Sequence, residues 1–121
     1  MSLAVWIGVV LIGGIGSVAR FLVDRTVARR TAWSFPLGTM TVNLSGAVIL
    51  GFVSRLALSP QAALLAGTAF VGAYTTFSTW MFETQRLAEE RQMWPAAANL
   101  ILSVVLGVAA AAVGQALAGA L

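Results

Sequence analysis

The residues best suited to chemistry lie between Gly72 and Trp80, inside an apolar run from Ala62 to Phe82. Four of these nine positions are Ser or Thr, whose hydroxyls compete for backbone hydrogen bonds and disfavour a helix. A break at membrane depth frees backbone N–H and C=O groups that lipid cannot pair, so it survives only inside protein or beside a wet cavity. The stretch therefore predicts a broken helix and a site. The alternative is that the hydroxyls join two continuous helices.

Two further apolar segments carry polar residues at helical spacing. Asn43 lies one turn beyond Thr39, and its amide offers two donors that suit an anion or a neighbouring carbonyl. Asn99 and Ser103, followed four residues later by Gly107, form a narrow stripe on another segment. That stripe predicts either the lining of a path or a groove for close helix packing.

Composition defines the elements that must hold these residues. The 121 residues are 60% hydrophobic and 9% charged, with a mean hydropathy of +0.93, which is typical of an integral membrane protein. The absence of Cys and His excludes thiol and imidazole catalysis, so we expect no enzyme. All basic residues are Arg, which at the ends of membrane spans reports orientation rather than nucleic-acid binding.

The predicted fold class is an all-α membrane protein with four transmembrane helices. Because a span needs about 20 apolar residues, the sequence accommodates one transmembrane domain over residues 1–121. The spans are expected at about 3–23, 36–57, 62–82 and 95–117, with the third one broken. The first apolar run lacks a basic leading region and a cleavage site, so it is expected to be a retained helix.

Three motifs together identify a family resemblance over nearly the whole chain. They are Gly13-Gly14-Ile15-Gly16-Ser17-Val18-Ala19-Arg20, Gly38-Thr39-Met40-Thr41-Val42-Asn43-Leu44-Ser45-Gly46 and Thr75-Thr76-Phe77-Ser78-Thr79. In this order they resemble the Fluc (CrcB) family of fluoride channels. The resemblance implies an antiparallel dimer of four-helix subunits in the cell (inner) membrane, with two narrow pathways for passive fluoride export and a central structural sodium ion. Fluoride and membrane lipid are then the expected partners.

The resemblance also assigns roles to particular positions. It implies that sodium is held by the backbone carbonyls of Gly72 and Thr75, which a broken helix would free. It implies a fluoride pathway lined by Asn43, Phe77, Ser78, Thr79, Trp80 and Ser103. An amide or hydroxyl donor, or the positive rim of an aromatic ring, can face a small anion without burying a full opposite charge.

The sequence departs from the family pattern at several positions near the break. Trp80 replaces a second Phe, and Asn99 takes a place often held by Tyr. Ala69, Ala73 and Tyr74 stand where Gly, Gly and Phe are common. Trp keeps an electropositive edge and adds an N–H donor, but its bulk could plug a path built for Phe.

Two other functions compete with the channel interpretation. A small proton-coupled drug exporter has a similar length, but it needs a carboxylate embedded in the membrane. The nearest acids here, Asp24 and Glu83, fall at span ends. A non-transporting membrane assembly protein would explain the small-residue packing, but not Asn43 together with the Thr-rich break.

The distribution of Arg bears on the partner. The connections between spans one and two and between spans three and four carry five Arg, whereas the connection between spans two and three carries only Arg55; the five are Arg25, Arg29, Arg30, Arg86 and Arg91. The positive-inside rule then predicts cytoplasmic Arg-rich connections and external termini. Dual topology, in which one chain inserts both ways and pairs with itself, is common in the family. The alternative is a dimer with a homologous chain of opposite orientation.

Overall fold

A computed structural model describes residues 1–32 and 34–121, and all regular structure in these residues is helical. The long helices are α1 (Leu3–Arg30), α2 (Leu37–Arg55) and α6 (Met93–Gly119). Residues 60–74 and 78–89 form shorter helices, which are α3 (Pro60–Ala63), the π-helix η1 (Leu64–Val71), α4 (Gly72–Tyr74) and α5 (Ser78–Glu89).

The long helices have the properties of membrane spans. Within the described residues, α1, α2 and α6 are each long and apolar enough to cross a membrane. Much of their apolar surface is also exposed; Val10 is 71% exposed on α1 and Val108 is 69% exposed on α6. Apolar surface on this scale is unfavourable in water but favourable in contact with lipid. The chain is therefore an all-α, multi-pass membrane protein, as the sequence predicted.

Local sequence accounts for where several helices begin. The Ser2 hydroxyl accepts a hydrogen bond from the N–H of Val5 and caps α1. Ser59 caps α3 in the same way, with Pro60 at the first helical position. Pro36 stands immediately before α2 and fixes the backbone where that helix starts.

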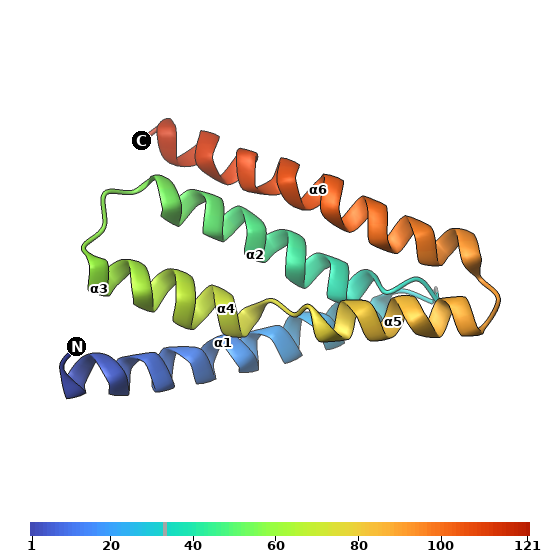
Figure 1. Cartoon of the computed structure of the whole chain (residues 1–121), viewed down its shortest axis with the longest axis horizontal. Helices are drawn as coiled ribbons and strands as arrows, with labels where there is room; N and C mark the ends of the chain where they lie inside the picture. The colour runs from blue at the N-terminus through green and yellow to red at the C-terminus, as the bar shows by residue number, and fades with distance from the viewer. Residues whose placement is uncertain (33) are drawn as a thin grey trace.

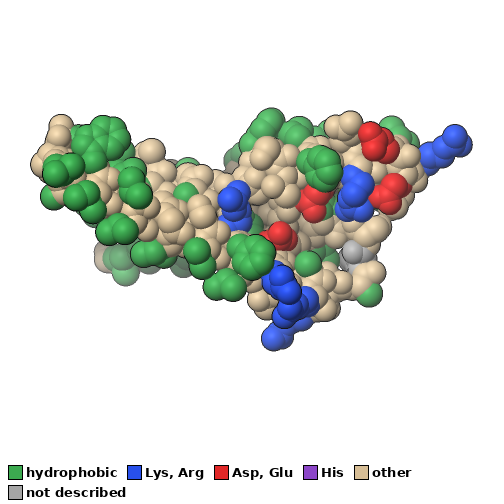
Figure 2. Space-filling view, turned by 90° about the horizontal axis from the view of Figure 1, so that it is seen from below, with side chains coloured by type: hydrophobic (Ala, Val, Ile, Leu, Met, Phe, Trp, Pro, Cys, Tyr) green, Lys and Arg blue, Asp and Glu red, His purple; other side chains and the backbone are tan. Residues whose placement is uncertain are grey.

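The helices lie roughly along one direction (Figure 1). α2 packs against α6 along its length, and α1 packs against α2, η1 and α4. Both termini and the connection from α2 to α3 lie at one end of the molecule, whereas the α1–α2 and α5–α6 connections lie at the other. Figure 2 shows charged side chains concentrated on this second half and hydrophobic side chains covering the opposite end.

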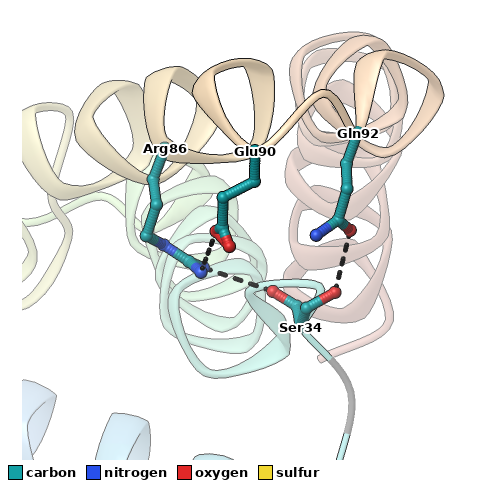
Figure 3. Close-up of polar contacts among 4 residues, drawn as sticks. All are labelled: Ser34, Arg86, Glu90 and Gln92. Atoms are coloured by element: carbon teal, nitrogen blue, oxygen red, sulfur yellow. Dashed lines mark hydrogen bonds and ion pairs between the residues drawn. The ribbon is translucent and has the colours of Figure 1, made fainter.

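Polar contacts tie the two connections at the charged end to each other (Figure 3). The Arg86 guanidinium donates to the Ser34 carbonyl at 3.2 Å and pairs with Glu90 at 3.0 Å, while the Ser34 hydroxyl donates to Gln92 at 3.0 Å. An exposed ion pair contributes little by itself. The set nevertheless fixes the start of α2 relative to the end of α5.

Glycines allow α2 and α6 to approach to backbone contact. A Cβ built on Gly51 of α2 would overlap the Ala111 carbonyl oxygen, and one on Gly114 of α6 would overlap the Val48 carbonyl oxygen. Any side chain at either position would force the helices apart. Gly107 lies on the same helix as Gly114, but its added Cβ would meet no described atom within 4 Å.

This difference predicts opposite effects of the same substitution at two sites in α6. Gly114→Ala should lower the thermal midpoint of the detergent-solubilised protein, because overpacking costs about 1–3 kcal/mol. Gly107→Ala is the matched control. It should leave stability unchanged or raise it by up to about 1 kcal/mol, because Ala favours a helix. Equal shifts in circular-dichroism melts of the two variants would contradict the glycine contact.

Candidate functional site

The site is built around residues 75–77, which separate α4 from α5 and are not helical. Thr75 is extended, with φ −84° and ψ 163°. Its N–H still donates to the Val71 carbonyl at 2.9 Å, so helical bonding stops only after this residue. The Ser/Thr-rich stretch singled out in the sequence therefore contains the end of one helix and the start of another.

Asn43 of α2 binds the backbone of this segment with both ends of its amide. Its Nδ2 donates to the Thr76 carbonyl at 2.9 Å, and its Oδ1 accepts from the Thr76 N–H at 2.8 Å. One side chain thus replaces two backbone hydrogen bonds that an uninterrupted helix would supply. Of the two partners that the sequence left open for Asn43, the structure shows the carbonyl.

Two backbone carbonyls near this segment lose their helical donors to side-chain acceptors. The N–H that would bond to the Gly72 carbonyl belongs to Thr76, and it donates to Asn43 instead. The N–H four residues after Thr75 belongs to Thr79, and it donates to the Thr76 hydroxyl at 3.2 Å. Gly72 and Thr75, the predicted sodium ligands, both line one hollow between η1, α4 and the end of α2.

Close packing on two sides holds the segment in place. A Cβ on Gly46 of α2 would overlap the Thr75 methyl group, and a Cβ on Gly16 of α1 would lie 2.7 Å from the Phe70 carbonyl oxygen. The buried Tyr74 hydroxyl hydrogen-bonds Ser45 at 2.8 Å. Only residues without a side chain allow α1 and α2 to come this close to residues 70–75.

A second hollow brings together four of the predicted pathway residues. Asn43, Phe77, Trp80 and Ser103 all line it, and they come from α2, α5, α6 and the break. Phe77 is 70% exposed. Its ring meets the Trp80 ring at 84°, with centroids 5.7 Å apart. The hollow thus combines an amide, a hydroxyl and aromatic edges, which are groups able to face a small anion.

The other two predicted pathway residues lie elsewhere. Thr79 lines a separate, more polar hollow between α1 and α2, together with Arg20, Asp24 and Thr39. Ser78 is exposed, and it lines neither the Asn43/Phe77 hollow nor the hollow that holds Thr79. Consecutive residues on a helix point about 100° apart, which accounts for the different surroundings of Ser78 and Thr79.

Three residues at this polar hollow, Thr39, Thr76 and Arg20, were not among the predicted pathway residues. Thr76 lines this hollow and also the hollow that holds Asn43 and Phe77. The Thr39 hydroxyl donates to the Glu83 carboxylate. The four-residue step from Thr39 to Asn43 placed both on one face of α2, and that was the available signal for Thr39. Arg20 also lines this hollow, from α1.

The indole N–H of Trp80, expected as an added donor, is already engaged. It donates to the backbone carbonyl of Asn99 at 3.0 Å. In this subunit Trp80 therefore presents ring carbon atoms, rather than a free N–H, to its hollow.

The Asn43 contacts predict a large stability effect. Asn43→Ala leaves the N–H and C=O of Thr76 unpaired, which costs about 1–3 kcal/mol for each group. The thermal midpoint should fall, and amide hydrogen exchange should accelerate from Thr75 to Thr79. Thr41→Ala is the control, because the exposed Thr41 hydroxyl only donates to Leu37 within α2. Equal destabilisation by both changes would contradict a special role for Asn43.

Comparison with known proteins shows the family of this chain. The family model described as CrcB-like protein, Camphor Resistance (CrcB), matches residues 7–115. The protein named Fluoride-specific ion channel FluC 2 of Mycobacterium tuberculosis is 70% identical over 115 residues, covering 95% of this chain and 91% of the relative. Its namesake in Mycolicibacterium paratuberculosis is 70% identical over 117 residues, covering 97% and 96%.

A more distant relative covers as much of the chain. The protein named Fluoride-specific ion channel FluC 1 of Leifsonia xyli is 40% identical over 123 residues, covering 98% of this chain and 90% of the relative. The resemblance inferred from the three motifs is confirmed, and the chain belongs to the CrcB family.

Proposed function

We propose that this chain is a subunit of a fluoride channel that lets fluoride leave the cell passively across the cell membrane. The observation that carries the proposal is the 70% identity, over nearly the full length, to relatives named fluoride-specific ion channels. The hollow lined by Asn43, Phe77, Trp80 and Ser103 supports it, because these groups suit a small anion.

In this proposal fluoride passes along donors and ring edges. Asn43 spends one Nδ2–H on the Thr76 carbonyl, and its second N–H can face the ion. The exposed Phe77 ring can offer its positive rim, and the Ser103 hydroxyl can donate. Ser78 and Thr79 would contribute hydroxyls to the pathway from outside this hollow. Several weak sites in series let an ion enter and leave.

The competing functions lack support. A proton-coupled exporter needs an embedded carboxylate for coupling, whereas Asp24 lies near the charged end of α1 and Glu83 accepts a hydrogen bond from Thr39. A purely structural assembly protein would not account for the names of the relatives. The same names describe channels rather than enzymes.

The proposed topology has four spans in one transmembrane domain over residues 1–121. Spans at about 3–23, 36–57 and 95–117 correspond to α1, α2 and α6. The span at about 62–82 would comprise η1, α4 and the start of α5 as one interrupted crossing. The hydrogen bonds between Asn43 and Thr76 support a break within the membrane, because they leave neither the N–H nor the C=O of Thr76 facing lipid without a partner.

A structural sodium ion fits the backbone at this break. The carbonyls of Gly72 and Thr75 have lost their helical donors to side-chain acceptors, and neutral oxygens suit a small hard cation. Among the described residues no group of three or more Asp, Glu, His or Cys side chains could bind a metal. Hard cations such as Ca²⁺ take about six to eight oxygens, so a second subunit would supply the remaining ligands.

We further propose that the functional unit is an antiparallel dimer, with dual topology or with a homologous chain as the partner. The Arg distribution favours the homologous partner. Arg29 and Arg30 lie in the last turn of α1, and Arg86 lies in the last turn of α5, at the same end of the molecule. Arg55, the last residue of α2, lies at the opposite end of the molecule, and its guanidinium packs on Gly119 at the end of α6. The partial negative charge of a helix C-terminus offsets part of its positive charge.

Liposomes test the proposed activity. Purified protein, alone or with its homologous partner, should release fluoride and retain chloride. Phe77→Ala should reduce the fluoride flux, because it removes an exposed ring edge from the hollow. Phe82→Ala is the matched control, since Phe82 is similarly exposed, at 68%, but lies outside that hollow. Equal fluoride and chloride fluxes, or no flux in any pairing, would refute the proposal.

Sodium dependence of stability tests the cation site. In protein purified without sodium, adding sodium should raise the thermal midpoint, because sodium at 100 times its dissociation constant raises the free energy of unfolding by about 2.7 kcal/mol. Thr75→Val should keep this dependence, because the substitution removes a hydroxyl but not the backbone carbonyl. A midpoint that sodium does not change, relative to a large organic cation, would exclude the site.

Topology reporters test the orientation. When this chain is expressed alone with a tag at each terminus, most copies should have external termini and cytoplasmic Arg-rich connections. Replacing Arg29 and Arg30 with Gln should increase the inverted fraction. If the unmodified chain forms a stable self-dimer with tags on both faces, the preference for a homologous partner is wrong.

A further inference from the structure

Trp80 belongs to a closed ring of three hydrogen bonds between α5 and α6. Its indole N–H donates to the Asn99 carbonyl at 3.0 Å, the Asn99 amide donates to the Thr84 hydroxyl at 2.8 Å, and that hydroxyl donates to the Trp80 carbonyl at 2.8 Å. Each member therefore holds the next. The bond from the Thr84 hydroxyl lies within α5 and is common for Thr in helices. The other two bonds join α5 to α6.

Burial makes this ring hard to open. Asn99 is 1% exposed, and a buried amide that loses its partner is costly. Trp80 is half-buried, and the partner of its N–H is a backbone carbonyl, which side-chain rotation cannot remove. The indole is consequently fixed in one orientation relative to α6.

The other side of the same indole faces the proposed pathway. Trp80 lines the hollow together with Asn43, Phe77 and Ser103. Ser103 lies one turn beyond Asn99 on α6, so the helix that accepts the indole hydrogen bond also lines this hollow. With its N–H engaged, the indole narrows this hollow without offering a donor to an anion.

We propose that Trp80 is a fixed constriction that limits fluoride flux through the pathway this subunit lines, and that Thr84 and Asn99 are positioning residues that hold it there. The inference rests on the proposed function as a fluoride channel. The indole is larger than a phenyl ring, and its anchor prevents it from swinging aside. Flux is therefore limited by the side chain at position 80, and indirectly by the hydroxyl at position 84.

The first experiment changes the constriction itself. Trp80→Phe keeps an aromatic ring but removes both the bulk and the anchor. In liposomes, with the same partner chain where one is required, its fluoride flux should exceed that of the unmodified protein several-fold, and chloride should still be retained. A flux equal to or lower than that of the unmodified protein would overturn the proposal.

The second experiment changes only the anchor. Thr84→Val removes the acceptor for Asn99 at nearly the same shape, whereas Thr84→Ser keeps a hydroxyl and serves as the control. In ¹⁵N-labelled protein, the Trp80 indole N–H signal, assigned by its loss in Trp80→Phe, should exchange with D₂O faster in Thr84→Val than in Thr84→Ser. Fluoride flux should rise in parallel. Unchanged exchange and flux in Thr84→Val would refute the positioning role.

The two readouts separate this inference from the channel function. If no protein in the series, Trp80→Phe included, passes fluoride, the proposed function fails and the constriction fails with it. The exchange of the indole N–H would then still decide whether the ring of hydrogen bonds holds Trp80. If the unmodified protein conducts but Trp80→Phe conducts no faster, only the constriction is wrong.

Discussion

The structure depends on the amide of Asn43 pairing both backbone groups of Thr76. Inside a membrane an interrupted helix is expensive, because each freed N–H or C=O must find a partner within the protein. Asn43 satisfies two of them at 2.9 and 2.8 Å. The dependence is mutual, since an uninterrupted helix would leave a polar amide in an apolar bundle without these partners.

α2 is the element through which this pairing affects the rest of the molecule. On one face, Asn43 binds Thr76 and Gly46 leaves room for the Thr75 methyl group. On another face, Gly51 brings α2 into backbone contact with α6. α6 also binds Trp80 through the Asn99 carbonyl. The hollow is therefore lined by residues of α2 and by residues of elements that contact α2.

The sequence predicted the helical membrane class, because hydropathy is a local property. It left the partner of Asn43 open, since composition carries no distances. It could not assign the Trp80 N–H to Asn99, which lies 19 residues away on another helix. The π-helix η1 was also not predicted, because its residues include good helix formers and no local feature specifies the wider turn.

The glycine contact between α2 and α6 has a consequence for biosynthesis. Gly51 and Gly114 pack across the same seam but lie far apart in the chain, and synthesis proceeds at roughly 5–20 residues per second. α2 therefore waits in the membrane for seconds before its main neighbour exists, held meanwhile by α1 and by the segment that Asn43 binds. Completion of the last helix, rather than insertion of the first, is the step that closes the bundle, and until then the glycine face of α2 is open to the insertion machinery or to a wrong partner.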